Sequence, residues 1–287
     1  MADTLGDILA AVTERLRAAG VEGPRRDARL LAGVALGLST AEMVAHPERV
    51  LSAAEVAAVE AAVARRERRE PVSRILGERE FRGLRFALTA ETLDPRPDSE
   101  VVVEAALRLL EGVAAPRVLD LGTGTGCLLL AVLAERADAV GVGLDAAPGA
   151  VAAAAANAAA LGLADRARFL RGDWREPGWQ AALGGPFDLV VANPPYIPDA
   201  EIAVLEPEVR EFEPHLALAG GADGLAPYRI LAPALAGLLT PRGGAVFEVG
   251  IGQAEAVAAM LAAAGMAEVA AFADLGGVAR AVAARRT

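Results

Sequence analysis

The first part of the chain places apolar side chains three and four positions apart, which is the spacing of amphipathic helices. Four helices are predicted, within residues 4–20, 24–39, 39–47 and 52–70. Ser39 or Thr40 is expected to cap the third helix, and Ser52 and Glu55 have the spacing of a capping box at the start of the fourth. We therefore expect a small helical bundle over residues 1–75, which docks a partner.

The pattern changes after this bundle. Residues 76–92 alternate polar and apolar side chains around Gly83, which predicts a β-hairpin linker, and Pro95 and Pro97 then exclude a helix. Residues 93–287 repeat a strand, a glycine-containing loop and a helix, and the chain ends with a helix and two more strands. Such alternation predicts a second, α/β domain with a Rossmann-like seven-stranded sheet, parallel and doubly wound, and ligands bind at the carboxyl ends of such strands.

Charge is distributed unevenly between these regions. All 28 basic residues are arginine, and the net charge is -10. Residues 1–90 hold 14 arginines and 13 acids, a net +1, so residues 91–287 hold the other 14 arginines and 25 acids, a net -11. Nucleic-acid binding requires basic surfaces, so we expect protein or small-molecule substrates and no direct nucleic acid partner.

Composition also argues against a membrane or secreted protein and against a disulfide-rich or metal-binding one. We find no apolar run long enough to span a bilayer and no basic leader before an apolar segment, so a cytoplasmic location without membrane association is expected. Cys127 is the only cysteine, and the two histidines lie far apart, so a disulfide framework and a His/Cys metal site are excluded.

A glycine-rich loop follows the first strand of the α/β domain. The stretch LDLGTGTGC places Asp120 before three alternating glycines, where backbone N–H groups at a helix start can approach a ligand closely. The dinucleotide pattern G-x-G-x-x-G would need glycine at position 127, which is Cys127. The loop instead resembles motif I of class I S-adenosylmethionine-dependent methyltransferases.

Acidic residues end the next two strands. Asp145 can accept hydrogen bonds from both hydroxyls of a ribose, a feature shared by nicotinamide and S-adenosylmethionine enzymes. Asp173 can accept a hydrogen bond from an adenine amino group, and Trp174 can supply a flat apolar wall. The alternative for this pair is a surface turn with a packing tryptophan.

The fourth strand ends in Asn193, Pro194, Pro195 and Tyr196. The Asn193 side-chain oxygen and the Pro194 carbonyl can each accept an N–H from a planar NH2 group, and the Tyr196 ring can stack on that group. The prolines fix the turn so that both acceptors converge, which is the preorganisation that methyl transfer to a planar nitrogen requires. This motif is the signature of methyltransferases that act on planar amino groups.

With this motif the chain resembles the release factor glutamine methyltransferases, the HemK/PrmC family. Three further stretches carry the resemblance: PVSRILGEREFRGLRF (71–86), DPRPDSE (94–100) and FEPHLALAGGADGLAPYRIL (212–231). The resemblance implies a class I methyltransferase that transfers a methyl group from S-adenosyl-L-methionine to the glutamine N5 of the Gly-Gly-Gln motif in bacterial class 1 peptide chain release factors, releasing S-adenosyl-L-homocysteine. It covers nearly the whole chain, least closely in the bundle.

The resemblance also implies roles for individual residues. The residues expected to bind the cofactor are Gly122, Thr123, Gly124, Thr125, Gly126, Asp145, Asp173, Trp174 and Asn193. The residues expected to bind the glutamine are Asn193, Pro194, Pro195 and Tyr196, of which Asn193, Pro194 and Tyr196 are assigned to catalysis. Arg96 and Glu100 either shape the entrance or only fix the linker.

The roles of two further stretches, residues 278–279 and the basic run 64–70, allow more than one interpretation. Val278 and Ala279 stand where charged residues are common in the family, which puts a substrate contact from that strand in doubt. The basic run ARRERRE (64–70) is interpreted as a solvated helix face, with an acidic partner surface or ribosomal RNA as the alternative.

Other functions remain as alternatives. The same Asn-Pro-Pro-Tyr motif would serve a glutamine methyltransferase of a ribosomal protein or an N6-adenine DNA methyltransferase. A non-catalytic S-adenosylmethionine-binding scaffold is disfavoured because both the glycine loop and the signature are intact. A monomer is expected.

Overall fold

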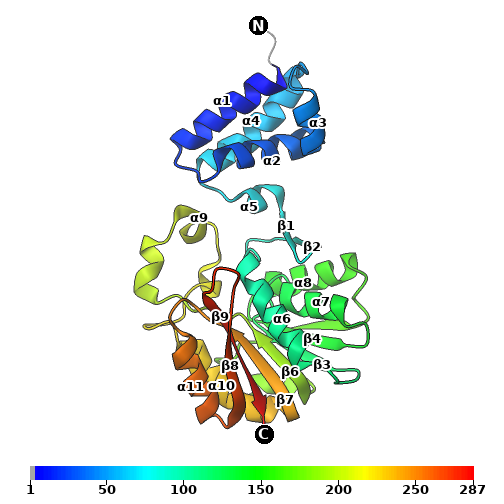
Figure 1. The fold of residues 1–287 in the computed structure, drawn as a ribbon, viewed down its shortest axis with the longest axis vertical. Helices are drawn as coiled ribbons and strands as arrows, with labels where there is room; N and C mark the ends of the chain where they lie inside the picture. The colour runs from blue at the N-terminus through cyan, green and yellow to red at the C-terminus, as the bar shows by residue number, and fades with distance from the viewer. Residues whose placement is uncertain (1–3) are drawn as a thin grey trace. The chain divides into compact units, whose positions relative to one another are not determined.

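The computed structural model describes residues 4–287, which form two compact units. Unit 1 comprises the chain up to Glu78 together with the segment Glu206–Phe212. Unit 2 comprises Arg79–Leu205 and Glu213–Thr287. Figure 1 shows the helical character of the first unit and the central sheet of the second.

Unit 1 is the predicted helical bundle. Ser39 and Ser52 both begin their helices with complete capping boxes, formed with Glu42 and Glu55. The helices bury a common apolar core that includes Leu16, which is fully buried. The helices are α1 (Leu5–Ala18), α2 (Pro24–Leu36), α3 (Thr40–Ala45), α4 (Ala53–Glu67) and α5 (Val72–Leu76).

A short segment from the later part of the chain belongs to unit 1. It contains helix α9 (Pro207–Arg210), and its Glu208 Oε1 accepts hydrogen bonds from Arg66 Nη2 at 3.0 Å and Arg69 Nε at 2.7 Å. Arg66 also donates to Asp27 Oδ2 at 2.8 Å, and its side chain is only 6% exposed. The prediction of a solvated face over 64–70 is therefore wrong for Arg66. The sequence-based boundaries placed this segment in the 93–287 domain, because pairing over such a sequence distance leaves no local pattern.

The predicted hairpin is formed by β1 (Glu78–Phe81) and β2 (Leu84–Ala87). Phe81 and Phe86 are buried in the core of unit 2, with ring centroids 6.4 Å apart. The Ala87 N–H donates to Asn157 Oδ1 at 2.8 Å, which fixes the end of the hairpin to a helix of the main domain.

Unit 2 is built on a seven-stranded sheet in the order β5-β4-β3-β6-β7-β9-β8. The strands are β3 (Arg117–Leu121), β4 (Val140–Asp145), β5 (Ala167–Arg171), β6 (Phe187–Ala192), β7 (Leu239–Glu248), β8 (Met266–Ala273) and β9 (Ala279–Arg286). The predicted fold class is confirmed, with one correction: β9 is antiparallel to both of its neighbours. A short turn joins β8 to β9 as a hairpin, and such a connection can produce only antiparallel pairing.

Helices cover both faces of this sheet (Figure 1). One core lies under α6 (Glu100–Leu109), α7 (Cys127–Glu135) and α8 (Pro148–Ala160), and the other lies under α10 (Ala226–Leu238) and α11 (Ala254–Ala263). Short 3-10 turns occupy Pro97–Ser99, Trp179–Ala182, Asp199–Val204 and His215–Ala217. Within residues 4–287, no helix has the length and apolar character needed to cross a membrane.

Candidate active site

The glycine loop connects β3 to α7 at the carboxyl edge of the sheet. Gly122 and Gly124 have φ angles of +76° and +54°, a region that favours glycine because it has no Cβ. A Cβ on Gly122 would lie 3.0 Å from Trp174 Cη2, whereas nothing lies within 4 Å of a Cβ on Gly124. Gly122 therefore lets the tryptophan ring approach, and Gly124 leaves open space beside the backbone.

Asp120, near the end of β3, is hydrogen-bonded to the glycine loop. Its Oδ2 accepts a hydrogen bond from Thr123 Oγ1 at 2.7 Å, and Oδ1 has no hydrogen-bond partner among the described residues. Burial raises the pKa of the Asp120 carboxyl to about 7, although the Thr123 hydrogen bond acts in the opposite direction. Its role in the structure is to hold the loop, since its side chain is fully buried.

Asp145 ends β4 next to the loop, as predicted. Its Oδ2 accepts a hydrogen bond from Gly124 N at 2.8 Å, and its Oδ1 accepts one from Ala147 N at 2.9 Å. Burial raises the pKa of the Asp145 carboxyl, against the lowering effect of these backbone bonds. Each carboxylate oxygen can accept a further bond, so both remain able to meet ligand hydroxyls.

Asp173 and Trp174 follow β5. Asp173 forms an ion pair with Arg175, whose Nη2 donates to Asp173 Oδ2 at 2.6 Å and holds the pKa of the carboxyl below its usual range. The Trp174 ring packs against the core below α10 and α11. Contact of Asp173 with an adenine stays a prediction.

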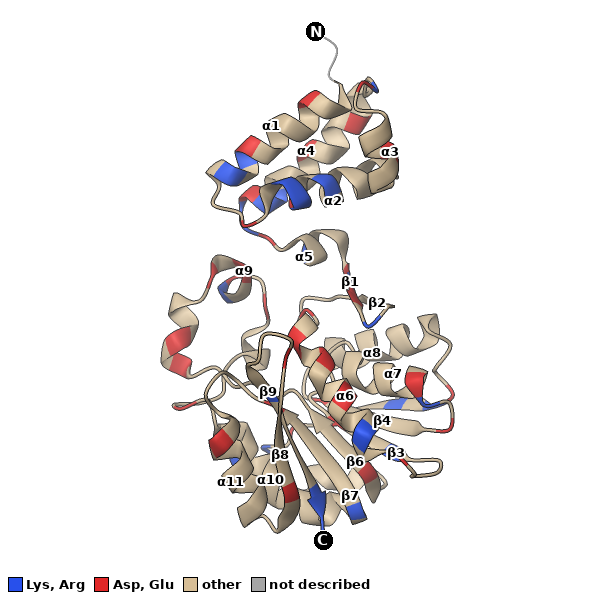
Figure 2. Ribbon diagram, viewed as in Figure 1, with Lys and Arg blue, Asp and Glu red and all other residues tan. Residues whose placement is uncertain are grey.

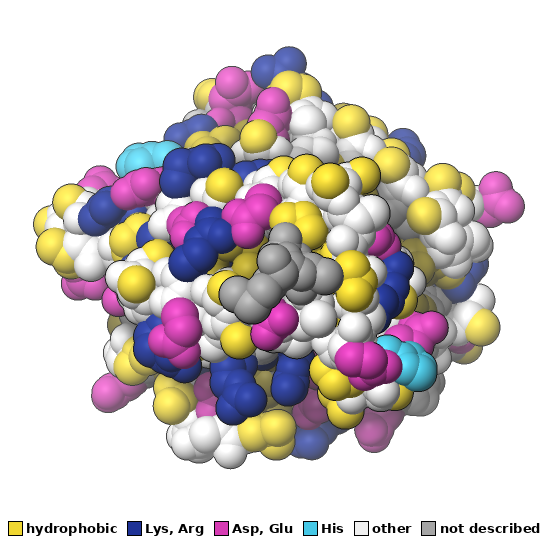
Figure 3. Space-filling view, turned by 90° about the horizontal axis from the view of Figure 1, so that it is seen from above, with side chains coloured by type: hydrophobic (Ala, Val, Ile, Leu, Met, Phe, Trp, Pro, Cys, Tyr) yellow, Lys and Arg dark blue, Asp and Glu magenta, His cyan; other side chains and the backbone are white. Residues whose placement is uncertain are grey.

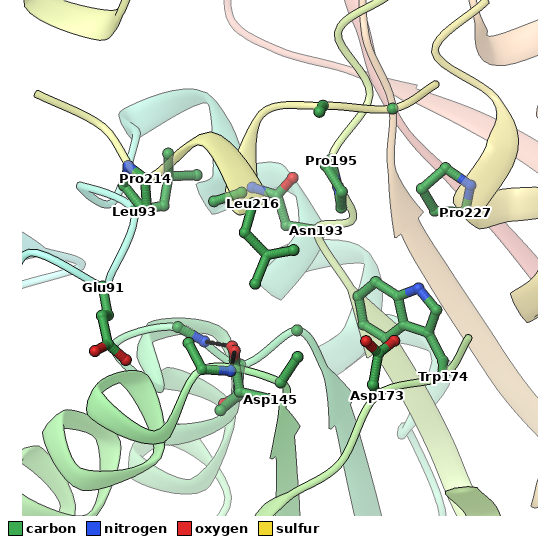
Figure 4. A pocket seen from close by; sticks show the side chains of 18 of the residues that line it. Glu91, Leu93, Asp145, Asp173, Trp174, Asn193, Pro195, Pro214, Leu216 and Pro227 are labelled. Carbon is green, nitrogen blue, oxygen red and sulfur yellow. Dashed lines mark hydrogen bonds between the residues drawn. The ribbon is translucent and has the colours of Figure 1, made fainter. Parts of the chain in front are cut away.

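A cavity of about 700 Å³ opens at this edge of the sheet, a size within the usual range of small-molecule sites of roughly 300–1,000 Å³. Figure 4 shows Asp145, Asp173 and Trp174 along one side of it, and Asn193, Pro195 and Leu216 on the side away from Asp145. The structure thus brings together most of the predicted residues. The cavity is lined by Gly122, Thr123, Gly124, Thr125, Asp145, Asp173, Trp174, Asn193 and Pro195.

Asn193 follows the last residue of β6 and faces this cavity. Its Nδ2 donates a long hydrogen bond of 3.5 Å to Ser99 Oγ. Because the amide nitrogen is directed to this serine, the Asn193 side-chain oxygen is left to accept from a ligand. This is the orientation that the predicted acceptor role requires.

The other signature residues lie differently. Pro194 is buried, and neither it nor Tyr196 is among the residues that line the cavity. The Tyr196 hydroxyl donates to Glu248 Oε1 at 3.4 Å, and the Tyr196 carbonyl accepts from Gln253 Nε2 at 2.9 Å. The loop is therefore anchored to the end of β7 and the start of α11. Gly126 is also outside the lining, and it caps the N-terminus of α7.

The segment before α6 contributes to the cavity wall through Arg96. Its Nη2 donates to Glu213 Oε1 at 2.9 Å, and Glu213 also accepts from Asp94 N at 3.1 Å. Arg96 thus both lines the cavity and fixes the linker to the segment after Phe212, whereas Glu100 does not line it.

The two departures from the family pattern are Val278, in the turn between β8 and β9, and Ala279, the first residue of β9. Neither Val278 nor Ala279 lines the cavity, and Val278 N donates to Asp274 Oδ1 at 3.0 Å. Arg280 instead pairs with Asp98 at 2.8 Å and with Asp274 at 3.0 Å.

Several residues near the site, among them Glu91, Ser99 and Glu248, were missed by the sequence analysis. Glu91 lines the cavity and accepts from Gly149 N at 2.6 Å, at the start of α8. Ser99 and Glu248 are both 2% exposed and lie beside the signature. Glu248 ends a buried apolar strand, as Asp145 does, and this signal could have found it.

The residues present fit an adenosyl cofactor with a positively charged sulfonium. Open space beside Gly124 admits a ligand against the backbone, Asp145 offers acceptors, and Trp174 offers a flat wall. Within residues 4–287, no cluster of three or more histidine, cysteine, aspartate or glutamate side chains is placed to hold a metal ion.

Together, the strand order and the loop at the end of β3 define a class I methyltransferase. A methyltransferase domain model matches residues 118–212, and the PrmC N-terminal domain model matches residues 7–77. The catalytic domain of hMettl16, solved with the MAT2A 3'UTR hairpin 6, shares the fold with a TM-score of 0.58 and 18% identity, covering 74% of this chain and 80% of that one.

Full-length relatives identify the family. A release factor glutamine methyltransferase of Rhodospirillum rubrum is 56% identical over 98% of this chain and 85% of its own length. Another, of Bradyrhizobium diazoefficiens, is 48% identical over 95% of this chain and 91% of its own length. The chain belongs to the release factor glutamine methyltransferases, which confirms the resemblance inferred from its motifs.

Proposed function

We propose that this protein transfers a methyl group from S-adenosyl-L-methionine to the side-chain nitrogen of the glutamine in the Gly-Gly-Gln motif of class 1 peptide chain release factors. The single observation that carries the proposal is that Asn193 and Pro195 share one cavity with the glycine loop and Asp145. Cofactor and amide substrate would thus meet at the carboxyl edge of the sheet.

Cofactor binding is assigned to the loop, Asp145, Asp173 and Trp174. The loop amides approach the ligand closely, Asp145 accepts from the ribose, and Trp174 covers a flat face of the adenine. When bound, the cofactor supplies an electrophilic methyl group on a sulfonium. The acids around the cavity favour its positive charge.

Asn193 orients the glutamine amide. Its side-chain oxygen accepts one N–H of the substrate NH2 group while its own NH2 group is directed to Ser99. The second N–H is assigned to the carbonyl of Pro194, the residue after Asn193; Pro194 is buried and does not line the cavity, so this contact requires the substrate amide to reach past Asn193. With both bonds made, the nitrogen lone pair is held toward the methyl donor. No strong base is required, because the proton on nitrogen becomes acidic only once the new carbon–nitrogen bond has formed.

The side of the cavity away from Asp145 suits a peptide segment. Pro214, Leu216 and Pro227 supply apolar lining from the stretch after Phe212 (Figure 4). Apolar walls with a few converging polar groups are typical of specific sites. A Gly-Gly pair before the glutamine would let the peptide backbone approach such a wall without side-chain clashes.

Charge favours a protein substrate over DNA. On the face in Figure 3, acidic and basic side chains are interspersed, and no broad basic patch appears on the part of that face formed by described residues. Arginines do lie along α2 in unit 1, which we assign to docking of the release factor (Figure 2). We expect the protein to act as a monomer in the cytoplasm, where translation termination takes place.

The proposal is tested with labelled S-adenosylmethionine and purified release factor. A release factor with its Gly-Gly-Gln glutamine changed serves as the matched control, and ribosomal proteins and DNA are parallel substrates. We expect label in the release factor and none in the control. Label found only in a ribosomal protein or in DNA would overturn the choice of substrate.

A further inference from the structure

A buried carboxyl group lies directly behind the signature loop. Glu248 is the last residue of β7 and is 2% exposed. Its Oε1 accepts from the Tyr196 hydroxyl at 3.4 Å, and its backbone carbonyl accepts from the Tyr228 hydroxyl at 2.7 Å. Glu248 therefore contacts a signature residue from the side that the cavity does not reach.

A second connection runs through Ser99, which is also 2% exposed. Its Oγ accepts from Asn193 Nδ2, and its side chain stabilises the charged form of the Glu248 carboxyl. A serine hydroxyl can accept one hydrogen bond and donate another at the same time. Asn193 thus contacts the Ser99 hydroxyl, and Tyr196 contacts the Glu248 carboxyl directly, so two buried polar side chains lie behind the signature.

Other charged groups face this carboxyl from the elements around it. Arg280 on β9 favours its charged form, and Asp98 in the turn before α6 disfavours it. Arg280 is itself held by ion pairs with Asp98 and Asp274. The carboxyl is therefore not neutralised by a direct ion pair, and its Oε2 has no hydrogen-bond partner among residues 4–287.

A purely structural role explains this arrangement poorly. Burying a carboxyl without a direct ion pair costs free energy, and an apolar residue at the same place would stabilise the core more. Neighbouring positions of β7, such as Val246 and Phe247, are fully buried apolar residues. Among the buried positions of β7, only Glu248, at the end of the strand beside the signature loop, carries a polar side chain.

We propose that Glu248 and Ser99 are positioning residues for methyl transfer: Glu248 anchors the Tyr196 hydroxyl, and Ser99 fixes the Asn193 amide with its oxygen toward the substrate. This inference rests on the proposed function and adds two residues to it. Without the Ser99 hydroxyl, the Asn193 amide can rotate and present its NH2 group to the NH2 group of the glutamine. Two donors would then face each other, and the substrate nitrogen would lose its orientation.

The experiment compares Ser99→Ala with Ser99→Thr, which keeps a hydroxyl. Misplacement of a reacting group by about 1 Å can cost roughly a hundredfold in rate. We expect Ser99→Ala to lower kcat roughly ten- to a hundredfold, with little change in the KM for the release factor or in the Kd for S-adenosylmethionine. Ser99→Thr should restore most of the rate. An unchanged kcat in Ser99→Ala, or equal loss in both variants, would overturn the proposal.

A double-mutant cycle adds a readout that a merely structural role would not give. If Ser99 acts through Asn193, Ser99→Ala should cause no further loss of residual turnover in an Asn193→Ala background. Independent, multiplicative losses would contradict the proposal. Glu248→Gln provides a second variant if Ser99→Ala does not fold, and it should lower kcat without weakening cofactor binding; wild-type kcat in Glu248→Gln would also overturn the proposal.

Failure of this inference can be separated from failure of the proposed function. If the wild-type protein labels the release factor but the variants behave as wild type, only the positioning role fails. If the wild type labels a different protein glutamine, the release-factor assignment fails, and the same variants are compared on that substrate.

Discussion

Asp145 holds the glycine loop in place: its carboxylate accepts a hydrogen bond from the Gly124 amide at 2.8 Å. This contact joins the ends of β4 and β3, the two neighbouring strands whose loops form one side of the cavity. We propose that the same carboxylate accepts hydrogen bonds from the cofactor ribose, which would make one side chain serve both the loop and the ligand.

Asp145→Ala should therefore weaken cofactor binding strongly. Loss of two hydrogen bonds to a charged group, at about 1.5–3 kcal/mol each, predicts a Kd raised roughly a hundredfold or more. Calorimetric titration with S-adenosylmethionine measures this. Asp173→Ala is a useful comparison, since Arg175 already engages that carboxylate and a smaller effect is expected. An unchanged Kd in Asp145→Ala would show that the ribose is held elsewhere.

Gly124→Ala tests whether the open space beside the loop belongs to the cofactor. The new Cβ meets no protein atom within 4 Å, but it adopts a positive φ, which costs about 1–2 kcal/mol. Gly112→Ala is a matched control, because Gly112 also has a positive φ and open space and does not line the cavity. We expect similar losses of stability in both variants and weaker cofactor binding only in Gly124→Ala. Equal cofactor binding in the two would contradict the assignment.

Asn193→Ala should separate binding from chemistry. Its side-chain oxygen is proposed to orient the substrate amide, and its removal leaves the loop and Asp145 intact. We expect cofactor affinity to stay within about threefold while turnover falls by roughly a hundredfold or more, the size associated with losing a preorganised polar group. Single-turnover kinetics measure this, and wild-type turnover would remove Asn193 from the mechanism.

Glu248 should make stability depend on pH. Burial raises its pKa from 4.5 to about 7, so the folded state binds a proton more tightly than the unfolded state does. Its stabilising contribution is complete below the unfolded pKa and is lost as the pH rises through the folded value, by up to roughly 3 kcal/mol.

Chemical denaturation at pH 5 and pH 8 tests this linkage. Wild type should lose stability over this interval, with Asp120 contributing in the same direction because burial also raises its pKa to about 7. Glu248→Gln should lose less. Identical pH dependence in the two proteins would show that Glu248 does not titrate in this range.

Arg66→Ala should destabilise unit 1. The Arg66 side chain is 6% exposed and pairs with Asp27 and Glu208, and breaking a buried pair costs about 3–5 kcal/mol. Arg68→Ala is the control from the same basic run, because Arg68 is exposed. A lower melting temperature is expected for Arg66→Ala alone, and equal melting temperatures would contradict this account.

Local signals in the sequence predicted much of the fold. Capping boxes at Ser39 and Ser52 set the starts of two helices, and acids or amides at the ends of apolar strands marked the carboxyl edge of the sheet. Asp120, Asp145 and Asn193 all lie at that edge. These features depend on neighbours only a few positions away, which is why they can be read from sequence.

Long-range pairings could not be predicted in the same way. Glu208 meets Arg66 across 142 positions, and Ser99 meets Asn193 across 94. The direction of β9 also depended on a turn that the sequence pattern did not resolve. Residues of this kind depend on how the chain folds back on itself, and no periodicity records that.

The most direct test of the central claim is tandem mass spectrometry of the release-factor peptide that contains Gly-Gly-Gln, after incubation with S-adenosylmethionine and the wild-type protein or Asn193→Ala. We expect one methyl group on the glutamine side-chain nitrogen with wild type and almost none with the variant. An unmodified glutamine with active wild type, or a methyl group on another residue, would contradict it.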